Sequence, residues 1–399
     1  MSGVHGAAPR PGVYLHVPFC AHRCGYCDFA VHVGAAAGLQ RRYVAALHAE
    51  LERVARAGPG ALAPPGARPQ RGWPKFGSVF VGGGTPTRLE AEQLAGLLRA
   101  VRARLPVAAD AEVTVEANPE DLSAAYLATL VRAGLTRVSL GAQSTAPHVL
   151  AFLDRRHDPA SVAGALSAAR AAGVGSVSVD LIYGAPAETD ADWRRSLAAV
   201  LGAGVDHVSC YSLTLEVNTP YARAVRAGSR PPPDDDVAAD RMGVAAQMLA
   251  AAGFTRYEIS NWARPGHASR HNRVYWAGGD YLGLGAAAHG HWRAADERAD
   301  AVARRWWNVR PTERYVRRVE AGAEPVGGGE LLDRGARRAE RLMLGLRTLE
   351  GVARHAVEPL DAGAVGDLVR AGVLATSPER LWLTPTGRPV ADAVAARLL

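Results

Sequence analysis

The sequence has few cysteines and no long apolar stretch. Its 399 residues contain 4 cysteines, too few and too closely bunched for the disulfide framework of a secreted protein. No stretch reaches the roughly 18 apolar residues of a membrane span, and residues 1–12 lack the apolar core of a signal peptide. We therefore expect a cytoplasmic protein, in which bunched cysteines are typical of metal binding.

Lysine is almost absent, and the basic charge comes from arginine. Of the 46 basic residues, Lys75 is the only lysine, and the formal net charge is +7. Alanine and glycine are also abundant, which is typical of coding bias, so the charge is weak evidence for a nucleic-acid partner. The arginines occur in scattered pairs such as Arg41-Arg42 and Arg317-Arg318, a pattern typical of a solvated surface.

Short apolar runs alternate with helix-like segments along the first half of the chain. Hydrophobic residues make up 48% of the sequence, enough for a large core. Segments 40–57 and 91–105 carry apolar residues at helical spacings of three and four. The apolar runs cover 13–19, 78–86, 112–120, 137–144, 176–186 and 207–216. Six such units predict a parallel sheet with helical crossovers, an α/β fold best described as an incomplete (β/α)6 barrel.

Polar or glycine-rich residues follow the apolar runs, where the predicted strands end. They include Cys20, glycines 82–84, Glu116, Gln143 and Asp180. Turn chemistry explains any one of them, and the glycines most easily. Ligands of such sheets and barrels gather at the carboxyl ends of the strands, so five such positions in register indicate a ligand site.

Proline- and glycine-rich stretches divide the chain. Residues 58–72 predict a loop, and residues 227–236 predict the end of the barrel. We therefore expect a barrel over 1–230, a barrel extension over 231–310 and a separate C-terminal domain over 311–399.

The C-terminal domain has a mixed pattern of helices and strand. Its predicted elements are helices within 334–352, 362–374 and 388–399 and a strand within 380–387. This order resembles a winged-helix-like α+β domain. Fold alone does not establish DNA binding, and no compact basic helix stands out. We expect a cap or docking surface and no nucleic-acid partner.

Cys20, Cys24 and Cys27 follow the spacing C-x3-C-x2-C. Thiolates are soft ligands suited to zinc or to iron–sulfur clusters. A closed zinc site usually needs four ligands, and His22 lies too close to its neighbours to complete the usual geometry. Three thiolates on one loop can hold three irons of a 4Fe-4S cluster and leave the fourth iron open to a ligand. Buried cysteines and a zinc knuckle are the alternatives.

The loop PFCAHRCGYC resembles the radical-SAM signature, with Tyr26 just before the last cysteine. The stretch GGGTP (82–86) resembles the segment that receives the aminocarboxylate of S-adenosylmethionine (SAM), where glycines permit close backbone approach. From Tyr14 to the C-terminus, the chain resembles the radical-SAM group that contains oxygen-independent coproporphyrinogen III oxidase and the HemW-type haem chaperones.

The resemblance implies a set of SAM-binding residues beside the cluster. They are Tyr14, Tyr26, Gly83, Gly84, Thr85, Glu116, Gln143, Arg155 and Asp180. Carboxylates and amides suit ribose hydroxyls and an ammonium group, and an arginine fork suits a carboxylate. The alternative for Arg155 is a surface ion pair, whereas Asp180, inside an apolar strand, needs a partner.

Three features favour the chaperones over the oxidases. The oxidases have a further cysteine where this chain has Phe29, and they carry a longer segment before the first cluster cysteine. The stretch HNRVYW (271–276) resembles a HemW motif whose histidine is tied to haem binding, which implies His271. Imidazole is a common haem ligand, and Tyr275 and Trp276 offer flat faces.

Other interpretations of the histidines stay open. His271 beside aromatic residues is also the pattern of a hydrogen-bonded core histidine, and His289 and His291 are further candidates. Cys210, on the sixth apolar run, is expected to be a buried and inert thiol.

The function implied by the resemblance is that of a haem chaperone. Its cofactors would be a 4Fe-4S cluster, SAM and haem, and its partner a haem acceptor such as a respiratory protein. The alternative is an oxygen-independent coproporphyrinogen III oxidase, a radical-SAM decarboxylase of porphyrin biosynthesis. Surface arginines also suit an anionic membrane surface, so peripheral membrane association and a homodimer are further hypotheses.

Overall fold

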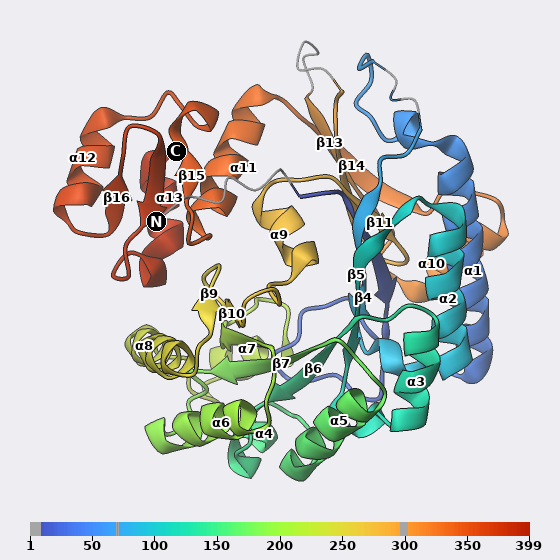
Figure 1. The fold of residues 1–399 in the computed structure, drawn as a ribbon, viewed down its shortest axis with the longest axis horizontal. Helices are drawn as coiled ribbons and strands as arrows, with labels where there is room; N and C mark the ends of the chain where they lie inside the picture. The colour runs from blue at the N-terminus through green and yellow to red at the C-terminus, as the bar shows by residue number, and fades with distance from the viewer. Residues whose placement is uncertain (1–8, 69, 71, 296–301) are drawn as a thin grey trace.

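The computed structural model describes residues 9–68, 70, 72–295 and 302–399. Six neighbouring strands form the parallel centre of one large sheet (Figure 1). They are β1 (Gly12–Val17), β4 (Phe76–Gly83), β5 (Val107–Ala117), β6 (Arg137–Gln143), β7 (Ser176–Tyr183) and β8 (His207–Ser212). Each overlaps one of the predicted apolar runs, and the incomplete (β/α)6 barrel is confirmed.

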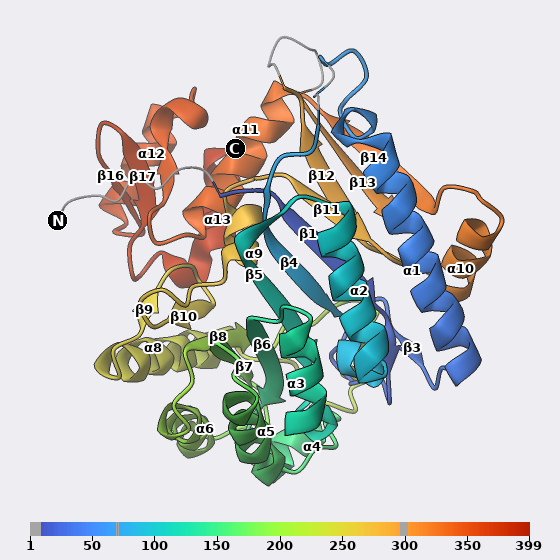
Figure 2. The ribbon, with the colours of Figure 1, turned by 45° about the vertical axis from the view of Figure 1, so that its right-hand side comes forward.

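Helices connect these strands and cover the outer face of the sheet (Figure 2). They are α1 (Ala37–Ala57), α2 (Ala91–Arg104), α3 (Ala124–Arg132), α5 (Pro159–Ala171) and α6 (Asp190–Gly202). Side-chain caps fix where several begin: Glu90 and Gln93 form a capping box at α2, and Thr189 and Asp192 form one at α6. The central strands alternate apolar side chains with polar ones, among them Ser78, Thr114 and Ser139, which are buried.

Further strands extend the sheet to twelve strands among the described residues. Beside β1 lie β11 (Tyr281–Leu284), which is parallel to it, and then β12 (His289–Arg293), β13 (Ala303–Asn308) and β14 (Val326–Leu332), which are antiparallel. Beside β8 lie β10 (Asn261–Ala263) and β9 (Thr255–Arg256). The helices of this region are α8 (Asp235–Ala251), α9 (Arg270–Trp276) and α10 (Thr312–Glu320).

The C-terminal segment forms a small α+β unit with its own core. It contains α11 (Arg334–Leu346), β15 (Val352–Ala353), α12 (Ala362–Arg370), β16 (Leu374–Thr376), β17 (Arg380–Leu383) and α13 (Ala391–Leu398). Its core includes Leu346, Leu374 and Leu381, and the expected winged-helix-like class is confirmed. Tyr315 and Val316 of α10 belong to the large core, and Ile259 belongs to the small one. The predicted boundary between residues 310 and 311 stays a prediction. The predicted boundary between residues 230 and 231 stays a prediction.

Short elements complete the described part of the chain. They are β2 (Phe19–Cys20), β3 (His32–Val33), α4 (Pro147–Phe152), α7 (Pro220–Arg226) and the 3-10 turns at Pro59–Ala61, Pro86–Arg88, Pro119–Asp121, Arg354–Ala356 and Arg388–Val390. Among the helices within the described residues, none combines the length and apolarity needed to cross a membrane.

Candidate functional site

The cysteine loop leaves β1 and is fastened to the end of β4 by its backbone. The N–H of Gly84 donates to the carbonyl oxygen of Val17, and that of Thr85 donates to Phe19, each over 2.8 Å. The short strand β2 pairs with β3 beyond the loop. These bonds fix the point at which the chain carries Cys20 away from the sheet.

The glycines of GGGTP are required by this close packing. A Cβ atom on Gly84 would lie 2.6 Å from the carbonyl carbon of Pro18, and one on Gly82 would lie 2.7 Å from a carboxylate oxygen of Glu116. Gly83 has a φ angle of +115°, which side-chain-bearing residues rarely adopt. The motif therefore joins β4 to the cysteine loop, and its predicted contact with SAM stays a prediction.

The thiols of Cys20, Cys24 and Cys27 are free and close enough to influence one another. Burial raises the pKa of Cys20, and burial raises that of Cys27 to about 11, with the neighbouring thiols adding to both shifts. A bound metal reverses this preference because it stabilises the thiolate. Three soft sulfur donors on one loop fit an iron–sulfur cluster. Within the described ranges, no three His, Cys, Asp or Glu side chains are grouped to hold one metal ion.

A path of polar contacts connects two of these thiols through neighbouring strands. The Cys20 Sγ lies 3.7 Å from the Thr85 hydroxyl, and Asn118 donates to that hydroxyl over 3.4 Å. Arg155 donates to the Asn118 side chain over 2.8 Å and lies 3.8 Å from the Cys24 Sγ. The Nε atom of Arg155 is buried without a hydrogen-bond partner. A guanidinium with a spare buried donor fits an anionic ligand such as a carboxylate.

Two carboxyl groups lie on the inner side of the barrel near this path. Glu116 lies one residue before the end of β5 and accepts a hydrogen bond from the N–H of Gly83 over 3.1 Å. Burial raises the pKa of Glu116 to about 7, and the charge of Asp180 adds to the shift. Asp180 accepts hydrogen bonds from Ser139 at 3.1 and 3.2 Å, and burial raises its pKa too. Ser139 is thus the hydrogen-bond partner that we expected the buried Asp180 to have.

The remaining predicted SAM residues differ in how deep in the barrel they lie. Gln143 ends β6 with a φ of 64°, where the pairing with β7 shifts register, a strained conformation that is common at functional sites. Tyr26 packs against the core around α4. Burial raises the pKa of Tyr26, the charge of Arg155 lowers it, and the Cys24 thiol raises it. Tyr14 lies further inside β1, and its hydroxyl is 3.1 Å from His16 Nδ1. Their role in SAM binding stays a prediction.

His271, at the start of α9, is enclosed on all sides. Its ring is 1% exposed and stacks on Phe80, with centroids 5.1 Å apart. Nδ1 lies 2.9 Å from the Ser78 hydroxyl, and Nε2 lies 2.8 Å from the Tyr275 hydroxyl. Burial lowers the pKa of His271 to about 3, so the ring is neutral. Both nitrogens already have partners, and ligation of an iron would have to displace Tyr275 or Ser78.

Sequence reasoning missed Asn118, which joins the Thr85 hydroxyl to Arg155. It lies two positions after Glu116 in EANPE, at the carboxyl end of β5, and that placement could have identified it. It also missed Phe80 as the platform under His271. Phe80 lies inside an apolar run, where nothing distinguishes an inward-facing aromatic residue from an ordinary core residue.

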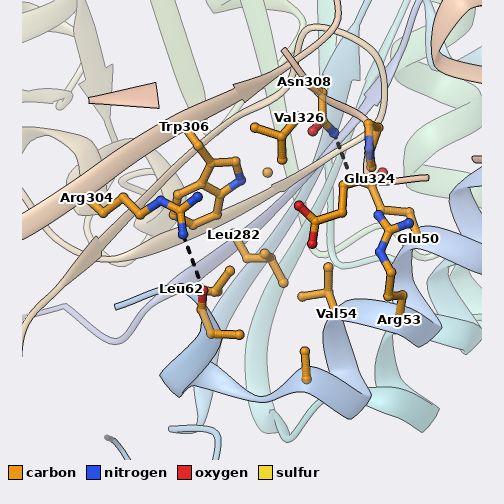
Figure 3. Close-up of a pocket in the computed structure, with 14 residues that line it drawn as sticks. Glu50, Arg53, Val54, Leu62, Leu282, Arg304, Trp306, Asn308, Glu324 and Val326 are labelled. Carbon is orange, nitrogen blue, oxygen red and sulfur yellow. Dashed lines mark hydrogen bonds between the residues drawn. The ribbon is translucent and has the colours of Figure 1, made fainter. Parts of the chain in front are cut away.

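The structure contains a cavity of about 100 Å³ whose lining includes Leu282 and Gly283, the partners of Val13 and Tyr14 in the sheet. It lies between α1 and strands β11, β13 and β14 (Figure 3). Its buried acid, Glu50, accepts hydrogen bonds from Tyr315, Asn308 and Gly285 over 2.6 to 2.8 Å. These bonds satisfy the carboxyl group within the fold. None of the predicted site residues lines this cavity.

Comparison with known proteins agrees with the geometry of the cysteine loop. A profile of the radical SAM superfamily matches residues 14–200. The protein named heme chaperone HemW in Mycobacterium tuberculosis is 44% identical over 400 residues, covering 99% of this chain and 97% of that protein. The chain belongs to the HemW family. The HemW protein of Escherichia coli is 37% identical over 284 residues, covering 71% of this chain and 70% of its own.

Similarity to solved structures supports the HemW assignment at the level of the fold. The radical SAM enzyme HemN, the coproporphyrinogen III oxidase of Escherichia coli, superposes with a TM-score of 0.78 at 21% identity, covering 98% of this chain and 90% of that one. This chain and that HemN therefore share a fold over most of their lengths.

Proposed function

We propose that the chain is a haem chaperone that holds a 4Fe-4S cluster and SAM, binds haem, and passes haem to an acceptor such as a respiratory protein. The observation that carries the proposal is the cysteine loop, whose three free thiols are followed by Phe29, 60% exposed, where an oxidase-type fourth cysteine would stand. The full-length relatives of this chain that are named heme chaperones support the same choice.

The cluster is held by Cys20, Cys24 and Cys27 in this proposal. When bound, such a cluster offers an open iron to the amino and carboxylate groups of SAM and, once reduced, an electron that can cleave SAM. The chain itself supplies the surroundings. The buried guanidinium of Arg155 orients the SAM carboxylate, and its contacts with Asn118 and Cys24 set its direction.

The barrel interior binds the rest of SAM. Glu116, whose carboxyl group is held by the Gly83 N–H, accepts from an ammonium or hydroxyl donor. Gln143 lies at the end of β6, and Asp180 lies within β7, the next strand of the sheet. Tyr14 and Tyr26 provide aromatic walls, and Gly83, Gly84 and Thr85 form the floor next to the loop.

The alternative is a coproporphyrinogen III oxidase, favoured by the shared architecture with HemN. That likeness rests on 21% identity and shows the fold alone. Haem ligation by His271, a homodimer, peripheral membrane association, a cytoplasmic location and the absence of a nucleic-acid partner all stay predictions.

One experiment separates the two functions. The full chain is reconstituted anaerobically with iron and sulfide, and haem is titrated while absorbance is recorded against haem-free protein. In parallel, coproporphyrinogen III is supplied with SAM and a reductant. Saturable haem binding without porphyrinogen consumption is the expected result. Rapid decarboxylation without haem binding would establish the oxidase and reject the chaperone.

A further inference from the structure

The cavity between α1 and the strands β11, β13 and β14 has an apolar interior. Its volume is about 100 Å³, and its lining includes Val54, Leu282, Trp306 and Val326. Leu282 and Trp306 are 1% and 5% exposed. An apolar cavity of about 150 Å³ can hold benzene, so this one admits a group of several carbon atoms. The interior therefore suits a short apolar side chain.

The indole of Trp306 contributes an unused hydrogen-bond donor to this space. Figure 3 shows its nitrogen on the side of the ring that faces the cavity. Among the described residues, no acceptor engages this N–H. Those of Trp73, Trp193 and Trp292 donate to neighbours over 3.0 to 3.1 Å. A nearly buried donor without an acceptor favours a ligand that supplies an oxygen atom.

Charged groups of both signs line the cavity and stay unpaired. The guanidinium groups of Arg53 and Arg304 lie on opposite sides of it (Figure 3). Each donates to a backbone carbonyl, that of Ala323 for Arg53 and that of Ala61 for Arg304. Within the described ranges, neither arginine forms an ion pair, and neither does Glu324, which also lines the cavity. Unpaired charges of both signs are complementary to a ligand that carries both.

The floor of the cavity is fixed by the buried acid Glu50. Tyr315, Asn308 and Gly285 donate hydrogen bonds to its carboxyl group over 2.6 to 2.8 Å. These bonds join α1 to the strands without any ligand. A site formed in advance binds its ligand at a lower cost in ordering.

We propose that this cavity binds a small zwitterion with a branched apolar side chain, which is the chemistry of an amino acid such as valine. The apolar group packs on Leu282 and Val54. The carboxylate accepts hydrogen bonds from Arg304 and from the Trp306 indole, and the ammonium group faces Glu324. The proposal concerns a second site and does not depend on the proposed chaperone function.

The test is a titration of the anaerobically reconstituted full chain with L-valine, followed by the indole N–H signals of its tryptophans in NMR spectra. Trp306→Phe identifies the signal of Trp306. That signal is expected to shift saturably, with a dissociation constant of about 1 mM or tighter. Its failure to shift at up to about 20 mM valine would overturn the proposal.

Two analogues test the charges of the ligand. The anion 3-methylbutanoate lacks the ammonium group of valine, and isobutylamine lacks the carboxylate. Each is expected to bind about tenfold more weakly than valine or worse. Equal binding of valine and either analogue would show that the site does not recognise a zwitterion.

Two variants test the residues that we assign to those charges. Arg304→Gln should weaken valine binding about tenfold and leave the weaker binding of isobutylamine unchanged, because that amine has no carboxylate. Glu324→Gln should weaken valine binding and leave the binding of 3-methylbutanoate unchanged. Arg56→Gln removes an exposed arginine of α1 that does not line the cavity, and this matched control should bind valine as the unaltered chain does.

Circular dichroism of each variant checks the fold. Unaltered valine affinity in both Arg304→Gln and Glu324→Gln would reject the site described here, even if the chain binds valine elsewhere. No haem enters these titrations, so their failure leaves the proposed chaperone function standing.

Discussion

Arg155 donates a hydrogen bond to the Asn118 side chain over 2.8 Å, and its other terminal nitrogen lies 3.8 Å from the Cys24 thiol. A lysine can make a single point contact but cannot reproduce this fork. In Arg155→Lys we expect SAM affinity to fall about tenfold or more, measured by calorimetry on reconstituted protein. Arg156→Lys, at the exposed neighbouring position, is the control. Equal affinity in both variants would place the SAM carboxylate elsewhere.

The three loop cysteines should be equally necessary for metal loading. Replacing Cys20, Cys24 or Cys27 by alanine is expected to reduce bound iron from about four atoms per chain to background, as measured by iron and sulfide analysis after anaerobic reconstitution. Cys210→Ala removes a thiol that is 1% exposed on β8 and should keep its iron. Zinc without sulfide in the unaltered chain would contradict the cluster.

Glu116 makes the stability of the metal-free chain depend on pH. Its folded pKa of about 7 lies above the ordinary value of 4.5, so the folded state favours the protonated acid. Its contribution to stability is present below pH 4.5 and is lost as the pH rises toward 7. Between pH 5 and pH 8 the unaltered chain should lose roughly 2 to 3 kcal/mol more than Glu116→Gln does. Urea unfolding at the two pH values measures this, and parallel losses in both chains would show that the folded carboxyl group is already ionised.

Gly84 should tolerate no side chain. In Gly84→Ala the added Cβ meets the backbone of Pro18 at 2.6 Å, and backbone cannot rotate away as a flexible side chain does. We expect a loss of about 2 kcal/mol or more in unfolding free energy and reduced iron uptake. Gly96→Ala, inside α2 with nothing within 4 Å of the new atom, should instead gain up to about 1 kcal/mol. Thermal unfolding compares the two variants. Equal melting points would show that the loop shifts to make room for the added methyl group.

The sequence allowed the barrel and the position of the site to be predicted. Short runs with apolar residues at alternate positions form the six strands, and the residues near their carboxyl ends meet at one end because the strands are parallel. Cys20 and Glu116 could be placed there from their positions after the apolar runs, whereas Asp180 lies inside β7. Partners contributed by distant segments could not, because no local pattern encodes them: Ser139 for Asp180, and Asn118 for Arg155.

The histidines show what periodicity and motifs cannot predict. HNRVYW drew attention to His271, yet whether a ring nitrogen is free depends on Ser78, 193 residues away in sequence. His289 was only one of several candidates in the sequence, and its exposure emerges from the pairing of β12 with β13. Whether a ligand atom is accessible depends on tertiary contacts. The sequence could therefore identify candidate histidines but could not show which of them are buried.

The backbone bonds from Gly84 and Thr85 to β1 and β2 have a practical consequence for handling the protein. They hold the cysteine loop in place with contacts that contain no metal, unlike a zinc finger, which is unfolded without its ion. Material bleached by air should therefore remain folded and accept fresh iron and sulfide on the bench without a refolding step.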